Sequence, residues 1–303
     1  MVWLVLVPLL LPLLLWPLAR LTAGSARPER AARALALVAS ITAASGLTGL
    51  ILVAATLADD IPSVVAYSHR ARSLGHVLPE PIPDAVAIAV TVLLALIAGR
   101  AVVELRRHRL VARDLHAIGP APHWLLVVDW DSPRAVAVPP HRGRRGHVLV
   151  TSGLLRLLSP REQAAVLAHE RAHLRRRHYR TTALAAAAAA VNPLLRPVES
   201  VVRLLAERSA DEDAAREVAD RRLVAQTVAK VAIAAHGSAD ALGFGGSNTR
   251  RRVEALVLPQ VGRLRSVAAP DAGAALLGAA ALLATAAACI GFVELLLAWL
   301  PGR

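Results

Sequence analysis

The stretch Val166-Leu167-Ala168-His169-Glu170-Arg171-Ala172-His173 decides how this chain has to fold. An α-helix places residues four apart on one face, so the imidazoles of His169 and His173 can reach one ion. Glu170 follows the first histidine and would lie beside that ion. Two imidazoles and a neighbouring carboxylate suit a hydrolytic zinc site. The pattern therefore predicts a helix that carries two metal ligands, with Glu170 as a general base.

The residues before this motif predict where its helix begins. Ser159 is a typical N-cap, Pro160 suits the first helical position, and Glu162 stands three residues after the cap. The helix should then run through the motif and end in the basic stretch at 175–178.

A hydrolytic zinc site needs a third protein ligand and an open position for water. Glu207 follows His173 by thirty-four residues, which is enough chain to fold back on a second helix. Asp211, four residues later on the same face, could accept a hydrogen bond from a ligand imidazole and fix its tautomer. The competing interpretation is a solvated helix face, because arginines stand nearby at Arg203, Arg208 and Arg216. Given the histidine motif, we favour Glu207 as the third metal ligand and Asp211 as the hydrogen-bond acceptor of a ligand imidazole.

The remaining histidines have weaker claims to the site. His178 comes five residues after His173, and a continuous helix would turn it to another face. Four more histidines fall in predicted loops or strands and are expected at the surface: His116, His123, His141 and His147. The single cysteine, Cys289, allows neither an internal disulfide nor a thiolate cluster, so any metal must use histidine and carboxylate.

The composition indicates a membrane protein. Of 303 residues, 55% are hydrophobic and only 3% aromatic, and the apolar residues come in blocks. Apolar runs at 1–19, 34–58, 85–99 and 272–298 predict transmembrane helices. A fifth run at 181–195 is short for a span, and we expect a helix that is buried in the domain or dips into the bilayer.

The charges predict the orientation of these spans. The formal net charge is +13. Arginines cluster after the first run and after Arg100, and such clusters mark cytoplasmic loops. They follow the first run rather than precede it, which favours an uncleaved span with its amino end outside over a signal peptide. The sequence thus predicts a multi-pass protein of the cell membrane: a three-span region at 1–105, a cytoplasmic domain at 106–265 and a C-terminal span at 270–300.

Short β-branched segments precede the helix of the motif. Segments at 124–128, 134–138 and 147–151 read as strands, with a turn at 131–133. A basic turn at 141–146 could bind phosphate or lipid headgroups, but a solvated loop is favoured. The expected fold class is mainly α and integral membrane, with four or five transmembrane helices and a cytoplasmic α+β domain that carries a small β-sheet.

The motif at 169–173 together with Glu207-Arg208-Ser209-Ala210-Asp211 resembles the zinc membrane peptidases of the BlaR/MecR type. It is similar, more distantly, to the HtpX and CAAX-prenyl endopeptidases, and the resemblance runs from about 134 to 256. It implies a zincin-like domain with one zinc ion per chain on His169, His173 and Glu207. It also implies that Ala135, Val136 and Ala137 form an edge strand on which substrate lies.

Two departures limit what the resemblance implies. The chain ends at Arg303, with no room for the penicillin-binding sensor of the β-lactam receptors, so sensing of β-lactams is not expected. HtpX-like enzymes have a late histidine near the site, whereas the comparable stretch at 247–252 offers Asn248 or Arg252 as the oxyanion or substrate contact.

The function expected from these features is that of a membrane zinc metalloendopeptidase. Its partners would be membrane lipids and a protein or peptide substrate, which the resemblance suggests is a cytoplasmic transcriptional repressor; direct nucleic-acid binding is not expected. A first alternative is a catalytically inactive sensor or adaptor that binds a transcriptional regulator, against which the intact Glu170 argues. A second is a basic membrane protein that binds nucleic acid or anionic lipid, with steep salt dependence and no sensitivity to chelators.

Overall fold

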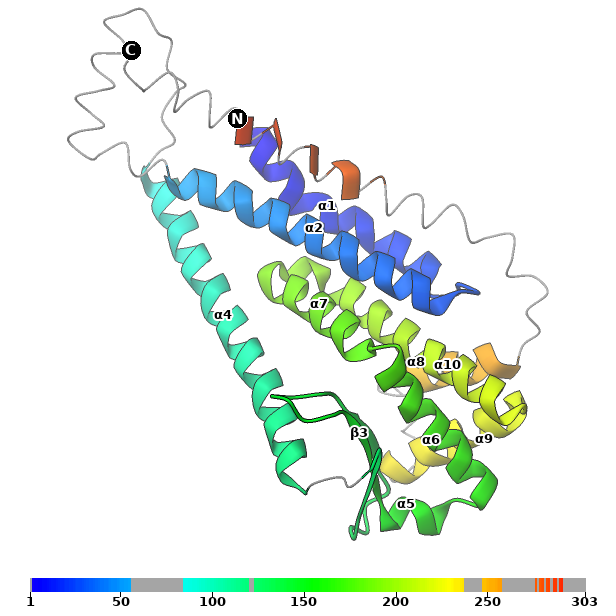
Figure 1. Ribbon diagram of the computed structural model, residues 1–303. Helices are drawn as coiled ribbons and strands as arrows, with labels where there is room; N and C mark the ends of the chain where they lie inside the picture. Colours follow the sequence, from blue (N-terminus) through cyan, green and yellow to red (C-terminus); the bar gives the residue numbers. More distant parts are fainter. Residues whose placement is uncertain are drawn as a thin grey trace, which may run out of the picture.

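Helices build most of this protein. The computed structural model describes residues 2–55, 84–119, 123–236, 247–257 and part of 276–290 (Figure 1). Before the sheet come α1 (Val2–Thr22), α2 (Pro28–Ala55) and α4 (Asp84–Ala117). After the sheet come α5 (Ser152–Leu157), α6 (Pro160–Arg175), α7 (His178–Val191), the 3-10 turn η2 (Pro193–Leu195), α8 (Arg196–Val218), α9 (Arg221–His236) and α10 (Ser247–Val257). The mainly helical fold with a small sheet confirms that part of the prediction.

Four helices pack into a bundle that holds the largest buried core. Helices α1, α2, α7 and α8 run side by side, and α4 passes them at an angle (Figure 1). The core joins leucines and valines of α1, α2 and α8 to small residues of α7, such as Ala185, Ala188 and Ala189. Alanine side chains let helix backbones approach closely. The apolar segment predicted at 181–195 corresponds to most of α7 together with η2, and five of its alanines are buried against neighbouring helices: Ala185, Ala186, Ala188, Ala189 and Ala190.

The three predicted strands form one mixed sheet in the order β1-β3-β2. Their bounds are β1 (Leu125–Val128), β2 (Ala135–Val138) and β3 (His147–Thr151). The central strand β3 is buried along its whole length and pairs parallel with β1 and antiparallel with β2. The turn at 131–133 therefore does not close a hairpin, because β3 lies between the two strands that the turn connects. This order leaves β2 at an edge of the sheet, next to α6.

Helix α6 begins as its sequence predicts. The Ser159 N–H donates to Oε2 of Glu162 at 2.8 Å, and the Ser159 side chain accepts from the Glu162 N–H, which completes the capping box. The helix ends at Arg175, and Arg177 has a left-handed backbone with φ of 55°. A left-handed residue interrupts a helix. The chain therefore turns there, and α7 begins with His178.

Helix α8 is more deeply buried than its sequence suggests. Arg208, Asp211 and Asp213 are all at most 4% exposed, so the solvated-face interpretation is wrong for this part of the helix. Arg208 donates to the backbone oxygens of Ala23 and, at 3.0 Å, of Ser25, in the turn between α1 and α2. These two backbone carbonyls accept hydrogen bonds from its guanidinium, which supports the burial of Arg208.

Two described helices are long and apolar enough to cross a bilayer by length and composition, Pro28–Ala54 and Ala85–Glu104. Within α1, the segment Leu10–Thr22 is a shorter apolar helix. Much of the C-terminal span predicted at 272–298 lies outside the described residues, as does the loop predicted at 59–83. The described residues thus support two of the four or five spans that the sequence predicts, and the domain boundaries at 105 and 265 stay a prediction.

Candidate metal centre

Three metal-ligating side chains from two helices meet at one point. His169 and His173 come from α6 and Glu207 from α8, and one ligand atom of each lies within 4.8 Å of the others. The Nε2 atoms of the two histidines are 3.1 Å apart. Each Nε2 atom is 3.5 Å from a different oxygen of Glu207. The sequence predicted this set from helical spacing and one long-range return of the chain.

These distances fit a tetrahedral zinc site. Bonds of about 2.05 Å from zinc to nitrogen or oxygen, at tetrahedral angles, place neighbouring ligand atoms about 3.3 Å apart. The separations of 3.1, 3.5 and 3.5 Å bracket that value. The donor set of two imidazoles and one carboxylate is also that of a catalytic site, since it leaves the fourth position open. The residues present therefore fit a zinc ion.

Asp211 and Arg252 hold the first histidine and the glutamate in place. Nδ1 of His169 lies 3.0 Å from Oδ1 of Asp211, which is 1% exposed. A proton held on Nδ1 leaves Nε2 free for a metal. Arg252 of α10 donates to both oxygens of Asp211 at 2.7 and 2.8 Å, and its Nη1 is 3.0 Å from Glu207. The guanidinium thus joins two carboxylates of α8.

His178 supports the second histidine, contrary to the prediction that it faces away. Its Nδ1 is 3.0 Å from Nδ1 of His173, and the residue is only 4% exposed. The prediction was wrong because it assumed a helix continuous through Arg177, where the chain instead turns. If Nε2 of His173 binds metal, Nδ1 of His173 carries the proton. This N–H then donates a hydrogen bond to Nδ1 of His178.

Burial and neighbouring charges shift the pKa values of the two histidines and of Glu207 in different directions. Burial lowers the pKa of His169, but bonds to Asp211 and Glu207 outweigh burial and raise that pKa to about 10. Burial, together with the nearby His169, lowers the pKa of His173 to about 3. Burial raises the pKa of the Glu207 carboxyl, yet His169 and Arg252 hold it below its usual range. Without metal, His169 is therefore a cation near pH 7, with one ring nitrogen toward Asp211 and the other toward Glu207.

Glu170 lies beneath the edge strand of the sheet. Burial raises the pKa of its carboxyl, and the Ala137 backbone N–H donates to it. The Thr151 N–H donates to the Arg134 oxygen, so alternate residues of β2, counted from Arg134, bond to β3. The N–H and C=O groups of Ala135 and Ala137, which lie between them, therefore point away from β3. The unpaired side of β2 therefore faces the centre.

A cleft of about 480 Å³ connects β2 with the metal ligands. Ala135, Val136 and Ala137 line one side of it, and the residues of the centre line another. Tyr179, Thr182 and Arg203 add polar groups that the sequence did not point to. An extended peptide on β2 would therefore pass the ligands and Glu170.

The structure separates the two residues suggested as oxyanion contacts. Asn248 is an exposed residue of α10 and does not line the cleft. Arg252 lies at the centre, but Asp211 and Glu207 engage its guanidinium. Its pKa is raised because these carboxylates outweigh burial. Arg252 thus organises the ligands.

Two of the four histidines expected at the surface are buried, so that expectation is wrong for them. His116 is 5% and His147 is 3% exposed, whereas His123 is exposed. Nε2 of His116 lies 2.8 Å from the Pro139 oxygen, and the ring of His147 packs edge-on against that of His116. These contacts attach the end of α4 to the sheet. Loop position alone did not reveal this packing.

Comparison with known proteins gives one match. The model of a family described as Peptidase family M48 matches residues 103–290, which is more than half of the 303 residues. The matched segment includes the sheet and every ligand of the candidate metal centre. No curated protein and no solved structure matches the chain.

Proposed function

The chain belongs to peptidase family M48, whose members are zinc-dependent peptidases, and we propose that it is a membrane-embedded zinc endopeptidase. The observation that carries the proposal is the meeting of His169, His173 and Glu207 beside Glu170 and below an open sheet edge. Family membership supports peptide hydrolysis, and the geometry supports the residues that would perform it.

His169, His173 and Glu207 would hold the metal. When bound, zinc supplies Lewis-acid chemistry, since it polarises a carbonyl and makes water more acidic. Asp211 and His178 would keep the Nδ1 protons of the two histidines in place, so that both Nε2 atoms point to the ion. Arg252 would balance the charge of Glu207 and Asp211.

Glu170 would move the proton in the reaction. Its carboxylate takes a proton from the attacking water and later gives it to the amine nitrogen of the leaving peptide. Burial raises the pKa of Glu170 toward the working pH, which makes it a stronger base than an exposed glutamate. An active site of this kind needs such a group within reach of both water and leaving nitrogen.

The substrate would be an extended protein segment. The outward N–H of Ala135 and the outward C=O groups of Ala135 and Ala137 can pair with a peptide as an added strand, whereas the Ala137 N–H donates to Glu170. Such pairing recognises backbone rather than side chains, so the chemistry suits many sequences. The earlier resemblance to BlaR/MecR-type peptidases suggests a cytoplasmic transcriptional repressor as one substrate; the family match does not distinguish that type from the HtpX type.

The membrane position is proposed from the apolar helices. The described candidates Pro28–Ala54 and Ala85–Glu104 support a bilayer, and the apolar runs at 1–19 and 272–298 would add spans. Arginines after α1 and along the second half of α4 favour the cytoplasm for the peptidase domain. The metal centre would then act on cytoplasmic or membrane proteins.

Metal dependence tests this function. The full chain is purified in detergent, its zinc content is measured, and hydrolysis of an unfolded fluorescent casein is followed with and without 1,10-phenanthroline. We expect about one zinc per chain, from the three-ligand site, and activity that the chelator removes and zinc restores. Hydrolysis that is indifferent to the chelator would contradict the proposal. Zinc binding without hydrolysis would support an inactive sensor that keeps the metal fold.

A further inference from the structure

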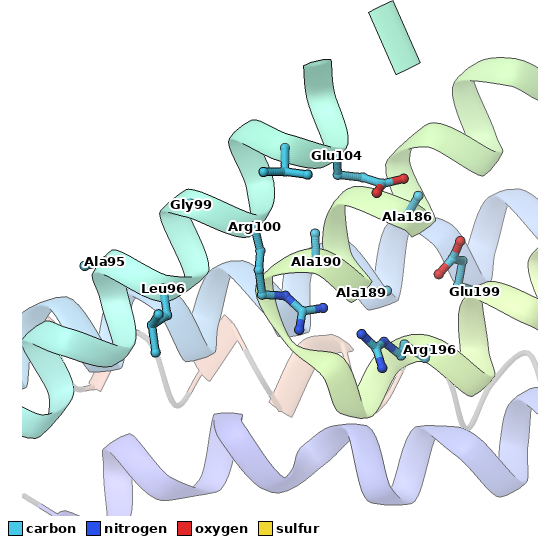
Figure 2. A pocket seen from close by; sticks show the side chains of 11 residues that line it. Ala95, Leu96, Gly99, Arg100, Glu104, Ala186, Ala189, Ala190, Arg196 and Glu199 are labelled. Carbon is cyan, nitrogen blue, oxygen red and sulfur yellow. The ribbon is translucent and has the colours of Figure 1, made fainter. Parts of the chain in front are cut away.

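A second cavity, distinct from the metal cleft, lies where α4 passes α7 and the beginning of α8. Its volume is about 500 Å³, and its walls come from these three helices (Figure 2). It shares no lining residue with the metal cleft. A ligand here would therefore not compete directly with a peptide on β2.

Two arginines from different helices point into this cavity. Figure 2 shows Arg100 of α4 and Arg196 of α8 with their guanidinium groups directed toward one another. Within the described part of the chain, neither guanidinium has a hydrogen-bond or ion-pair partner. Two cations that face each other repel, so an anion between them would stabilise the arrangement.

The two glutamates that also line the cavity have interactions of their own. Glu199 accepts from Nε and Nη2 of Arg203, at 3.0 and 2.7 Å, one turn further along α8. Glu104, too, has an interaction. The paired Glu199 therefore leaves Arg100 and Arg196 as cationic groups available to a ligand.

The rest of the cavity is apolar and opens onto an apolar helix face. Small or aliphatic residues line it: Ala95, Leu96, Val103, Ala186, Ala189 and Ala190. Toward its N-terminus, α4 exposes an apolar face with Ile88, Val92 and Leu96, and each of these residues is at least 54% exposed. A hydrocarbon chain can lie along this face, whereas a small inorganic anion would use only the arginines.

We propose that this cavity binds one anionic phospholipid, with its phosphate between Arg100 and Arg196 and an acyl chain along α4. The inference rests on the membrane position proposed above. Planar guanidinium groups bind phosphate through paired hydrogen bonds. Arg100 stands near the end of the apolar segment Ala85–Glu104, which is the depth of lipid headgroups if that segment spans the bilayer.

Lipid binding to the full chain in detergent tests the proposal. The probe is fluorescent phosphatidylglycerol, titrated against the wild type, Arg100→Gln, Arg196→Gln and the double variant. Each loss of a charge-assisted contact should weaken binding about tenfold. Arg196→Lys should bind better than Arg196→Gln, because it keeps the charge. The matched control is Arg106→Gln, an exposed arginine of α4 that does not line the cavity.

The competitors identify the source of the anion. Unlabelled phosphatidylglycerol should displace the probe, and neither phosphatidylcholine nor inorganic phosphate should do so at the same concentration. Equal affinity of the cavity variants and Arg106→Gln would overturn the site, and displacement by inorganic phosphate would overturn the lipid as its ligand. Zinc content is measured in every sample so that the two proposals can be judged separately. Absence of zinc would count against the peptidase proposal, whereas lipid affinity that the cavity variants leave unaltered would count against the lipid site.

Discussion

At the scale of single residues, the centre gives its two histidine ligands different partners. His169 has the carboxylate of Asp211, whereas His173 has the imidazole of His178. A carboxylate attracts the Nδ1 proton by charge, and a neutral imidazole only accepts it. Burial lowers the pKa of His178 to about 4, so His178 is neutral near pH 7 and able to accept.

Replacing His178 tests that supporting role. His178→Ala should weaken zinc binding about 10- to 100-fold, which is typical for the loss of a group that orients a metal ligand. The measurement is zinc affinity by competition with a chromophoric chelator, and hydrolysis should return at high zinc. The control is His123→Ala, which removes an exposed histidine. Equal zinc affinity in the two variants would show that His178 does not position His173.

At the scale of elements, α8 connects the metal centre to the rest of the protein. Glu207 reaches the metal site, and Arg208 beside it holds the turn between α1 and α2. One turn later, Asp211 orients His169. Asp213 binds Arg176, the C-cap residue of α6, and Arg216 of α8. Arg176 continues that network to Glu29 of α2 at 2.7 Å. A displacement of the α1–α2 turn would therefore act on α8, the helix that carries Glu207 and Asp211.

Asp213 should stabilise the fold in a pH-dependent way. Burial raises the pKa of its carboxyl, but bonds to Arg176 and Arg175 outweigh burial and lower it. A lowered pKa gives stability above the unfolded value of about 3.9, and that stability is lost as pH falls through the folded value. Asp213→Asn should therefore lower the free energy of unfolding at pH 7 by about 2 kcal/mol, since the arginines are partly exposed.

Thermal unfolding in detergent at pH 7 and at about pH 3 measures this dependence on Asp213. The difference between the variant and the wild type should shrink at the lower pH. Asp131→Asn is the control, because the Asp131 side chain is 100% exposed and should change little at either pH. A difference that is as large at pH 3 as at pH 7 would refute the assignment.

The start of α5 depends on a glycine. A Cβ atom on Gly153 would lie 2.0 Å from the Asp131 backbone oxygen, which cannot move without displacing the β1–β2 loop. Gly153→Ala should therefore cost about 1–3 kcal/mol of stability, as overpacking typically does. Gly119→Ala is the control, since its Cβ would meet only a Leu126 methyl at 3.9 Å. Equal melting temperatures of the two variants would contradict this explanation.

Local interactions explain which elements the sequence could predict. The spacing of His169 and His173, the capping box at Ser159 and the β-branched strands each depend on residues close in the chain. The position of His178 depends on one left-handed residue, Arg177, and no residue type requires that conformation there. The burial of Arg208 depends on the distant Ala23 and Ser25 carbonyls, which no local pattern contains.

At the scale of the whole molecule, the same helices would serve the membrane and the active site. The bundle of α1, α2, α7 and α8 contains the apolar α2 and also the helix that carries Glu207. The chain would therefore be anchored through part of its catalytic framework rather than through a separate tether. Charge clusters and apolar runs predicted a separate membrane region at 1–105 and a cytoplasmic domain at 106–265. They did not predict that α7 and α8 pack against α1 and α2 in one core.

Membrane fractionation tests the arrangement. The full chain should remain in the membrane pellet after extraction with alkaline carbonate and be released by detergent, because apolar helices partition into the bilayer. A cysteine placed at exposed Arg145, in the Cys289→Ala background, should react with a membrane-impermeant maleimide only after the cells are opened. Release by carbonate, or labelling of intact cells, would contradict the proposed location.

The role of Glu170 is the central claim, and one paired measurement tests it most directly. Zinc content and casein hydrolysis are measured on the same detergent-purified samples of wild type and Glu170→Gln. Because Glu170 moves the proton but does not hold the metal, the variant should keep about one zinc per chain and lose at least about 100-fold in hydrolysis. A variant that holds zinc and cleaves casein at the wild-type rate would contradict the mechanism.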